Sequence, residues 1–144
     1  MHLKSGTWVA VCDGGKFLLL QNSGDIGSLD LRVVAHETID AEALPERDGR
    51  GPSPDGTQAR KGRSHIHSVE EIAEHRFIKS VSAELDERVK TGGIVDLVLI
   101  ADQKTLGLLR HQICEHTQGA IRYEIGGDFA HDTVDEIEAL LARQ

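Results

Sequence analysis

Residues 94–101 (IVDLVLIA) constrain the fold of this chain more than any other segment. Every residue of the run except Asp96 is apolar. A strand with one face in water alternates polar and apolar residues, so a nearly continuous apolar run indicates a strand covered on both faces. We therefore predict a central strand, parallel to a neighbour, in a mixed sheet of three-layer α/β type.

Three more strands are predicted upstream of this run. Residues 7–12 (TWVAVC) and 16–22 (KFLLLQN) are apolar and flank a strong turn signal, Asp13 followed by two glycines. Residues 29–36 largely alternate in polarity, which predicts a strand with one buried face. The residues expected on that face are Leu29, Leu31, Val33 and Ala35. Strands joined by such short turns most simply form an antiparallel meander.

Three helices and one more strand complete the predicted domain. Ser68 followed by Glu70 and Glu71 is typical of a helix N-terminus, and apolar residues then recur every four positions until Gly92. Residues 104–116 predict a second helix, 121–125 a strand and 133–141 a last helix. Leu106, Leu109 and Ile113, with Cys114 as a further candidate, are expected on the inner face of the second helix. The predicted order over residues 1–144 is β-β-β, long segment, α-β-α-β-α, in a single domain.

Residues 40–67 separate the meander from the first helix and show little apolar periodicity. Compact domains seldom contain connections longer than about 12–15 residues unless these are functional or disordered. This segment is therefore the first place to look for function, and we expect a binding loop there.

Charge and composition limit the classes of partner. A net charge of −8 and a pI of about 5.4 disfavour general nucleic-acid binding, so we expect no DNA partner. The cations Arg60, Lys61 and Arg63 nevertheless form a local basic run that suits RNA. Aromatic residues make up only 3% of the chain, which leaves few platforms for base stacking.

Cysteine usage and the N-terminal sequence indicate a compartment. Cys12 and Cys114 lie far apart and show no paired-cysteine spacing, which favours a reducing environment. The chain has no signal-peptide pattern at its start and no apolar run near the ~20 residues of a membrane helix. We expect a soluble, cytoplasmic protein with no membrane partner.

Four segments of the chain carry a family resemblance. They are GTWVAVCDGGKFLLLQN (6–22), EEIAEHRFIKSVSAEL (70–85), DLVLIADQKTLGLLR (96–110) and IRYEIGGDFAHDTVDEIEALL (121–141). These segments resemble the bacterial host attachment proteins, a family considered related to the middle domain of archaeal and eukaryotic class-one release factors. The element order also resembles ribonuclease H-like sheets.

The release-factor resemblance implies a role for the long segment. In that domain the loop after the third strand carries a Gly-Gly-Gln tripeptide that enters the peptidyl-transferase centre and helps water attack peptidyl-tRNA. The corresponding residues here are Gly56, Thr57 and Gln58, followed by the basic run. Thr57 departs from the pattern, because a β-branched residue does not easily adopt the positive-φ conformations open to glycine. Gln58 is thus a catalytic candidate in an incomplete motif.

The ribonuclease H resemblance implies a second hypothesis, a Mg²⁺-dependent nuclease. Its candidate ligands are Asp13, Glu74 and Asp102, with Glu70, Glu71 and Asp128 nearby in the pattern. The structural alternative is that Asp13 and Asp128 stabilise turns beside glycines and that the helix acids serve a first helical turn. His65, His67 and His75 do not complete a recognised zinc spacing.

These observations favour binding over catalysis. No nucleotide-binding or nucleophile-elbow motif is present in the sequence, and we expect no cofactor and no resident metal. The predicted function is that of a non-catalytic protein that contacts a ribosome, tRNA or protein partner through residues 40–67. The alternatives are a peptidyl-tRNA hydrolase that uses Gln58 and a metal nuclease that uses the acidic residues.

Overall fold

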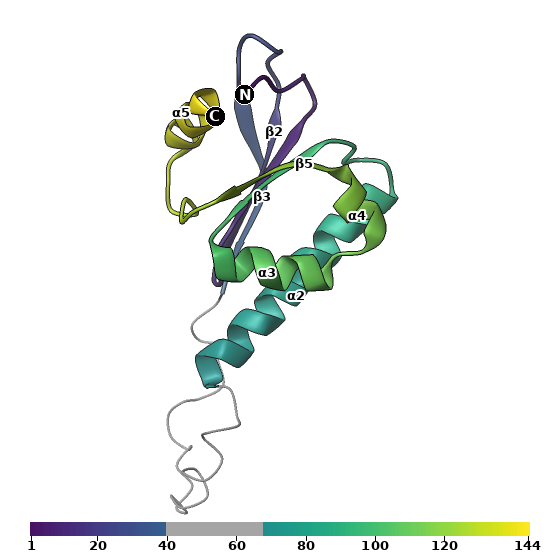
Figure 1. Cartoon of the computed structure of the whole chain (residues 1–144), viewed down its shortest axis with the longest axis vertical. Helices are drawn as coiled ribbons and strands as arrows, with labels where there is room; N and C mark the ends of the chain where they lie inside the picture. The colour runs from purple at the N-terminus through teal and green to yellow at the C-terminus, as the bar shows by residue number, and fades with distance from the viewer. Residues whose placement is uncertain (40–67) are drawn as a thin grey trace, which may run out of the picture.

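The computed structural model describes residues 1–39 and 68–144 and contains a five-stranded mixed sheet with helices on both faces (Figure 1). The strands are β1 (Trp8–Cys12), β2 (Lys16–Asn22), β3 (Leu31–Thr38), β4 (Leu97–Ala101) and β5 (Ile121–Gly126). The helices are α2 (Val69–Lys90), α3 (Gln103–Gln112), α4 (Glu115–Ala120) and α5 (Val134–Arg143). The α/β class and the mixed sheet predicted from the sequence are confirmed.

The strand order is β3-β2-β1-β4-β5. β1 pairs with β2 in antiparallel orientation and with β4 in parallel orientation, and β4 is also parallel to β5. All five residues of β4 are buried, so the predicted central strand is confirmed. Because β1, β4 and β5 run in the same direction, their carboxyl ends meet at one edge of the sheet. We call this edge the carboxyl edge and the opposite one the amino edge.

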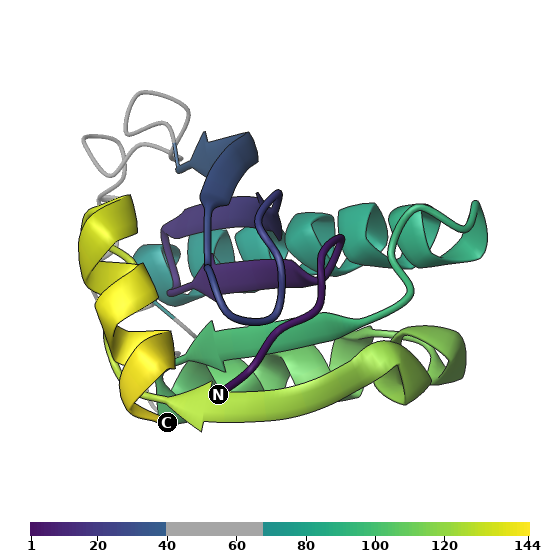
Figure 2. The same cartoon turned by 90° about the horizontal axis from the view of Figure 1, so that it is seen from above.

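Two apolar clusters cover the two faces of the sheet. On the α2 face, α2 and α3 pack against alternate strand residues such as Phe17, Leu19 and Leu99. On the α5 face, Leu140 and Leu141 of α5 pack with neighbours including Leu20 and Val98. Figure 2 shows α5 crossing the strands close to the arrowheads of β4 and β5, with α2 and α3 on the opposite face. The layers therefore follow α/β/α order.

Capping fixes where the two outer helices begin. Ser68 Oγ accepts the backbone N–H of Glu71 at 3.1 Å, and the Glu71 carboxylate accepts the N–H of Ser68 at 3.0 Å. Thr133 and Glu136 form the same reciprocal pair at the start of α5. Each pair satisfies backbone donors that the first helical turn cannot satisfy internally. The predicted N-cap at Ser68 is confirmed.

The predicted burial pattern of the third strand is wrong in part. Leu31 is buried, whereas Val33 is 47% exposed. The pairing with β2 shifts between Leu19 and Leu20, which pair with Ala35 and Val33, so Val34 has no partner in the register. This bulge turns Ala35 to the α2 face, while Leu31 remains on the α5 face. A strict alternation could not have predicted the change of face.

The predicted helix over 104–116 is two helices. α3 ends at Gln112, and Ile113 adopts an extended conformation with ψ of 151° and a buried side chain. α4 then begins after Cys114, whose side chain is exposed rather than inward as expected. The carboxylate of Asp86 on α2 accepts the N–H of Cys114 and the hydroxyl of Thr117. This long-range carboxylate stabilises the start of α4 in place of a local cap.

No helix within residues 1–39 and 68–144 is long and apolar enough to cross a membrane.

Candidate functional site

A cleft of about 510 Å³ opens at the carboxyl edge of the sheet. It forms where the chain leaves β1, β3, β4 and β5, and helix α2 supplies one wall. The strand order changes direction between β1 and β4, because the chain runs outward from β1 to β3 on one side and from β4 to β5 on the other. Crevices at the carboxyl ends of strands at such positions commonly hold ligands in α/β proteins. The lining residues are Asp13, Gly14, Gly15, Lys16, Thr38, Glu74, Asp102, Asp128 and His131. The cleft thus contains all three acids of the predicted acidic site.

Asp13 organises the turn between β1 and β2. Its Oδ1 atom accepts the backbone N–H groups of Gly15 and Lys16, both at 2.7 Å. Its Oδ2 atom lies 3.3 Å from Nε2 of His131, a side chain that is largely exposed. A short side chain that bonds to the backbone two and three residues later is the usual reason for Asp in a turn. Most of the hydrogen-bonding capacity of Asp13 is therefore used within the protein.

Asp102 caps helix α3. Its Oδ2 atom accepts the N–H of Thr105 at 3.1 Å, and its Oδ1 atom accepts the Thr105 hydroxyl at 2.7 Å. Thr105 is itself buried, so the capping carboxylate also satisfies a hydroxyl that has little access to water. Asp102 follows β4 and directly precedes α3, and its capping geometry accounts for an acid at that position.

Glu74 reaches the cleft from α2 and pairs with a lysine of α3. Its Oε1 atom lies 3.0 Å from Nζ of Lys104, and this contact raises the pKa of the Lys104 ammonium group. Gly14 makes the approach possible, because a Cβ atom at that position would lie 2.9 Å from Cδ of Glu74. Gly14 therefore has a packing role in addition to its place in the turn.

The cleft brings the predicted acids together without directing them at one point. In the part of the chain that the structure describes, no three His, Cys, Asp or Glu side chains are grouped closely enough to hold a metal ion. Asp13, Asp102 and Glu74 instead bond to backbone groups, to a hydroxyl and to a lysine. The acidic site as a nuclease centre stays a prediction.

The electrostatics of the cleft favour cations over phosphate. Four carboxylates line the cleft, whereas its basic lining residues are Lys16 and the largely exposed His131. Lys104 adds a positive charge that Glu74 neutralises. An RNA backbone would meet net repulsion here, so phosphate contacts are better made by another surface. His131 was missed in the sequence, because nothing in its local context links it to a turn 118 residues earlier.

Cys12 lies directly before Asp13 and is unsuited to nucleophilic chemistry. Burial raises the pKa of its thiol to about 12, and the nearby charges of Asp13 and Asp102 act in the same direction. A thiol with so high a pKa stays protonated at neutral pH, and the thiolate is the reactive form. Cys12 is a core residue, as its apolar strand predicted.

The segment predicted to bind a partner is attached at the same edge of the sheet. Ile39, the last described residue before it, donates its N–H to the carbonyl of Gly15 in the β1–β2 turn at 2.9 Å. The predicted binding residues Gly56, Thr57, Gln58, Arg60, Lys61 and Arg63 lie outside the described residues. Their proposed role stays a prediction, and the described part of the chain fixes only where the segment begins and ends.

Comparison with known proteins gives one family match. The model of a family described as bacterial archaeo-eukaryotic release factor family 12 matches residues 6–141. No curated protein matches the chain. The match covers every strand and all of the described helices except the last residues of α5. The predicted resemblance to release factors is confirmed, whereas the narrower resemblance to host attachment proteins stays a prediction.

Proposed function

Because the chain belongs to bacterial archaeo-eukaryotic release factor family 12, we propose that it acts in translation as a ribosome-binding protein. The proposed contact is made through the segment between β3 and α2. The observation that carries the proposal is the length of the family match, which spans residues 6–141 and hence the whole sheet. Release factors act on ribosomes, so a ribosomal partner is the simplest one for this domain.

The position of the segment supports its assignment as the contact region. It follows the third strand and precedes the long helix, as the catalytic loop does in the release-factor domain that the sequence resembles. Ile39 is held against the β1–β2 turn, and the capping pair of Ser68 and Glu71 holds the start of α2. Both attachment points are therefore fixed by hydrogen bonds. The acidic cleft beside them disfavours phosphate, which leaves the basic run Arg60, Lys61 and Arg63 as the better RNA contact.

We favour binding over catalysis for two reasons. The cleft carboxylates of Asp13, Glu74 and Asp102 already bond to groups of the protein, so a metal ion would have to share these carboxylates with those partners. The Gly56-Thr57-Gln58 tripeptide has threonine where the release-factor motif has its second glycine. A contact role needs neither a metal centre nor the complete tripeptide.

Sedimentation with purified ribosomes through a sucrose cushion tests the proposal. The full chain is expected to sediment with ribosomes, and the double variant Arg60→Gln/Lys61→Gln to lose most of this binding. The matched control is Arg76→Gln/Lys79→Gln, which removes the same two residue types from the exposed face of α2. Neither Arg76 nor Lys79 is in an ion pair with any residue of the described ranges. The control variant is expected to bind like the unchanged protein.

Two results would contradict the proposal. If the full chain does not sediment with ribosomes, the ribosomal role fails. If both double variants lose binding equally, the association reflects overall charge and the segment has no special part in it. Removal of residues 46–66 provides a second check, because it should abolish binding that the double variant only weakens.

Peptidyl-tRNA hydrolysis is the second candidate, and the family match favours it over the nuclease. Ribosomes that carry peptidyl-tRNA would release peptide when the protein is added, and Gln58→Ala would abolish the release. Release that Gln58→Ala leaves unchanged would assign the chemistry to other residues. Mg²⁺-dependent cleavage of RNA that disappears in Asp13→Asn would instead support the nuclease.

A further inference from the structure

A second, smaller cavity lies at the amino edge of the sheet, at the opposite end of the strands from the acidic cleft. Its volume is about 200 Å³. The N-terminal segment forms one side, and the beginnings of β4 and β5 form the other. The residues used below are Lys4, Asp96, Val98, Arg122 and Tyr123, all of which line it. We call this cavity the amino-end groove.

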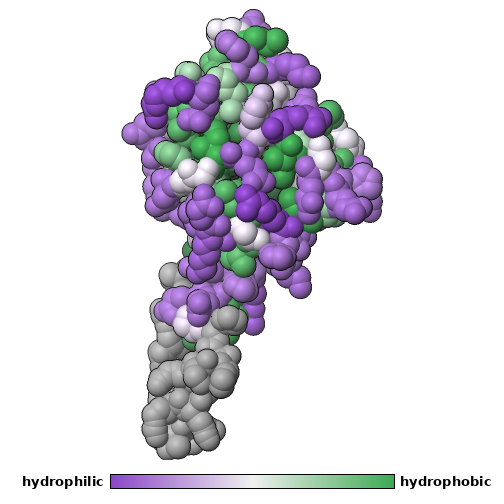
Figure 3. Space-filling model, in the orientation of Figure 1, coloured by the Kyte–Doolittle hydropathy of each residue, from purple (hydrophilic) through white to green (hydrophobic). Residues whose placement is uncertain are grey.

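Tyr123 gives the groove an exposed aromatic ring. Its register partner is Val98, which belongs to the cluster on the α5 face, so the ring lies on that face of the sheet. Figure 2 shows that α5 crosses this face of the sheet near the other edge, away from the beginning of β5. Tyr123 is 50% exposed, whereas Trp8, Phe17 and Phe77 are buried. Figure 3 shows apolar side chains at the surface between hydrophilic ones on the face where α5 and β5 are seen in Figure 1.

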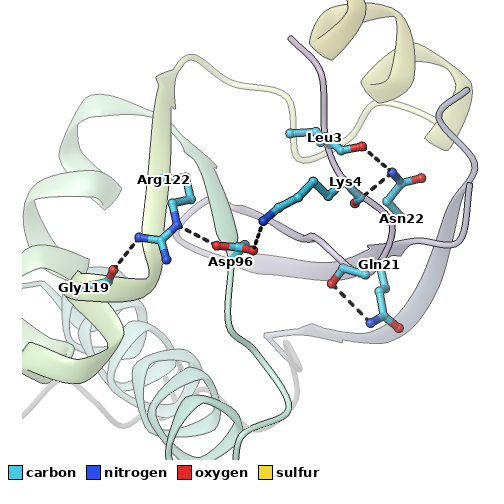
Figure 4. Close-up of polar contacts among 8 residues, drawn as sticks. Leu3, Lys4, Gln21, Asn22, Asp96, Gly119 and Arg122 are labelled. Carbon is cyan, nitrogen blue, oxygen red and sulfur yellow. Dashed lines mark hydrogen bonds and ion pairs between the residues drawn. The ribbon is translucent and has the colours of Figure 1, made fainter. Parts of the chain in front are cut away.

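A bulge in β5 directs Arg122 toward the groove. The pairing with β4 shifts between Leu97 and Val98, whose partners are Ile121 and Tyr123, so Arg122 has no partner in the register. Its Nε atom donates to Asp96 at 2.6 Å, and its Nη1 atom donates to the carbonyl of Gly119 at 2.9 Å. These two bonds fix the plane of the guanidinium group, as Figure 4 shows.

Lys4 brings a second cation to the same carboxylate. Its Nζ atom lies 3.5 Å from Asp96 Oδ2, and Figure 4 shows the two cations approaching Asp96 from opposite sides. The hydrogen bond from Arg122 lowers the pKa of Asp96, and the charge of Lys4 adds to the effect. One carboxylate therefore holds two cations, which leaves an excess positive charge on a chain whose net charge is −8.

We propose that the amino-end groove binds single-stranded RNA, with one base stacked on Tyr123 and the adjoining phosphate on the solvent side of Lys4 and Arg122, whose side chains stay about half exposed or more beside Asp96. An aromatic ring beside positioned cations is the usual arrangement in proteins that bind single strands without sequence preference. A peptide partner would need a longer apolar surface than one ring and the small floor at Val98. If the protein binds ribosomes as proposed, the ribosome supplies the single-stranded RNA. The inference rests on the proposed function only for this source of the RNA.

Fluorescence anisotropy with a labelled oligouridine of about 12 nucleotides tests the groove. Tyr123→Ala is expected to weaken binding by about 5- to 150-fold, as loss of one stacked base does, and Tyr123→Phe to stay within about twofold of the unchanged protein. Tyr123→Leu provides a second variant that keeps an apolar strand residue and loses the stacking ring. The buried Trp8 reports by its fluorescence whether each variant is folded.

Variants of charged residues distinguish RNA binding at the amino-end groove from general electrostatic attraction. Arg122→Gln should weaken binding and reduce its salt dependence, because one phosphate contact is lost. The matched control is Arg110→Gln. Arg110 lies on α3, pairs with Glu124 of the same strand β5 and contacts the opposite face of the sheet. Arg110→Gln should leave binding unchanged.

Several outcomes would contradict the proposal that the amino-end groove binds RNA. The first is no binding by the unchanged protein. The second is binding by folded Tyr123→Ala and Tyr123→Leu that equals binding by the unchanged protein. The third is an equal loss of binding in Arg122→Gln and Arg110→Gln. Binding of an acidic peptide but not of the oligouridine would assign the groove to a protein partner and also overturn it. The ribosome experiment stays separate. Sedimentation that Tyr123→Ala leaves intact, with no oligouridine binding, would refute the groove alone, and oligouridine binding without sedimentation would refute the ribosomal role alone.

Discussion

Asn22 at the end of β2 connects two segments to the sheet, the N-terminal segment and the connection between β2 and β3. Its side chain is buried, and its Nδ2 atom donates to the carbonyls of Leu3 and Lys4 at 3.0 and 3.2 Å. Its Oδ1 atom accepts the N–H groups of Gly24 and Asp30, both at 3.0 Å. All four bonds are to backbone groups, so only a residue with both a donor and an acceptor can replace it. Figure 4 shows the two bonds to Leu3 and Lys4.

Asn22→Ala is expected to lower the free energy of unfolding by about 1–3 kcal/mol, because buried backbone groups lose their partners. Urea unfolding followed by Trp8 fluorescence measures the change. The matched control is Gln21→Ala on the adjacent residue, whose side chain makes one long bond of 3.4 Å at an exposed site. The control should change stability by less than about 0.5 kcal/mol. Equal effects of the two variants would show that Asn22 is not needed for this attachment.

Residue types also explain which site features could be predicted. Asp13 and Asp102 follow strands β1 and β4, so the element order alone predicts that they share an edge of the sheet. His131 and Lys104 reach the same cleft through contacts that no local pattern reveals. The bulge at Arg122 decides which face Tyr123 takes, and it depends on pairing with β4 rather than on the sequence of β5. The groove was therefore not predictable.

At the scale of elements, a pair of acids lies between β3 and α2. Glu37 of β3 pairs with Phe17, whose side chain lies on the α2 face, and Glu84 of α2 lies opposite. A hydrogen bond with Glu84, then burial and the charge of Glu84, raise the pKa of Glu37 above its usual value of 4.5. Arg88 binds the Glu84 carboxylate at 3.0 Å, one helical turn later.

This pair makes stability depend on pH. Because the pKa of Glu37 is higher in the folded than in the unfolded protein, the folded protein holds a proton that the unfolded chain releases. The contribution of Glu37 to stability is therefore present below about pH 4.5 and is lost as the pH rises through the folded-state value. Glu37→Gln should remove this loss.

Urea unfolding at several pH values from about 4 to 7 measures the effect. Glu37→Gln should gain stability relative to the unchanged protein as the pH rises, because the amide cannot ionise. Glu87→Gln, an exposed substitution on the same helix, is the control and should follow the unchanged protein. A Glu37→Gln curve parallel to that of the unchanged protein would contradict the proposed linkage.

Secondary structure was predictable where one local signal decides it. The apolar run of β4, the turn after β1 and the N-cap at Ser68 each act within a few residues, and all three predictions are confirmed. The end of α3 at Gln112 was not predicted, because it depends on the burial of Ile113 and on a carboxylate of Asp86 from another helix. Tertiary contacts override the local pattern there.

At the scale of the whole molecule, the first half of the sheet depends on the second half of the chain. β1 lies between β2 and β4, and the helices that cover its two faces, α2, α3 and α5, all follow residue 67. The residues of β1 are completely buried only when these elements are in place. The domain should consequently fold as one unit.

A peptide of residues 1–39 should be unfolded in water, because a meander without its covering layers cannot keep apolar faces from solvent. Circular dichroism would show little strand structure, and Trp8 would emit as a solvent-exposed indole. The full chain at equal concentration is the control, since its Trp8 is buried. A peptide spectrum with native-like strand content would mean that the meander is stable alone.

The parallel strands of this fold also set the distance between the carboxyl edge and the amino edge of the sheet. The acidic cleft and the attachment of residues 40–67 are at the carboxyl edge, whereas Tyr123 and its cations are at the amino edge. β4 has five residues, so the two edges are about 16 Å apart along the strand. A sheet cannot shorten or bend as a linker does. If both edges contact one ribosome, the sheet keeps the attachment point of residues 40–67 and the ring of Tyr123 at that spacing, and each contact raises the effective concentration of the other.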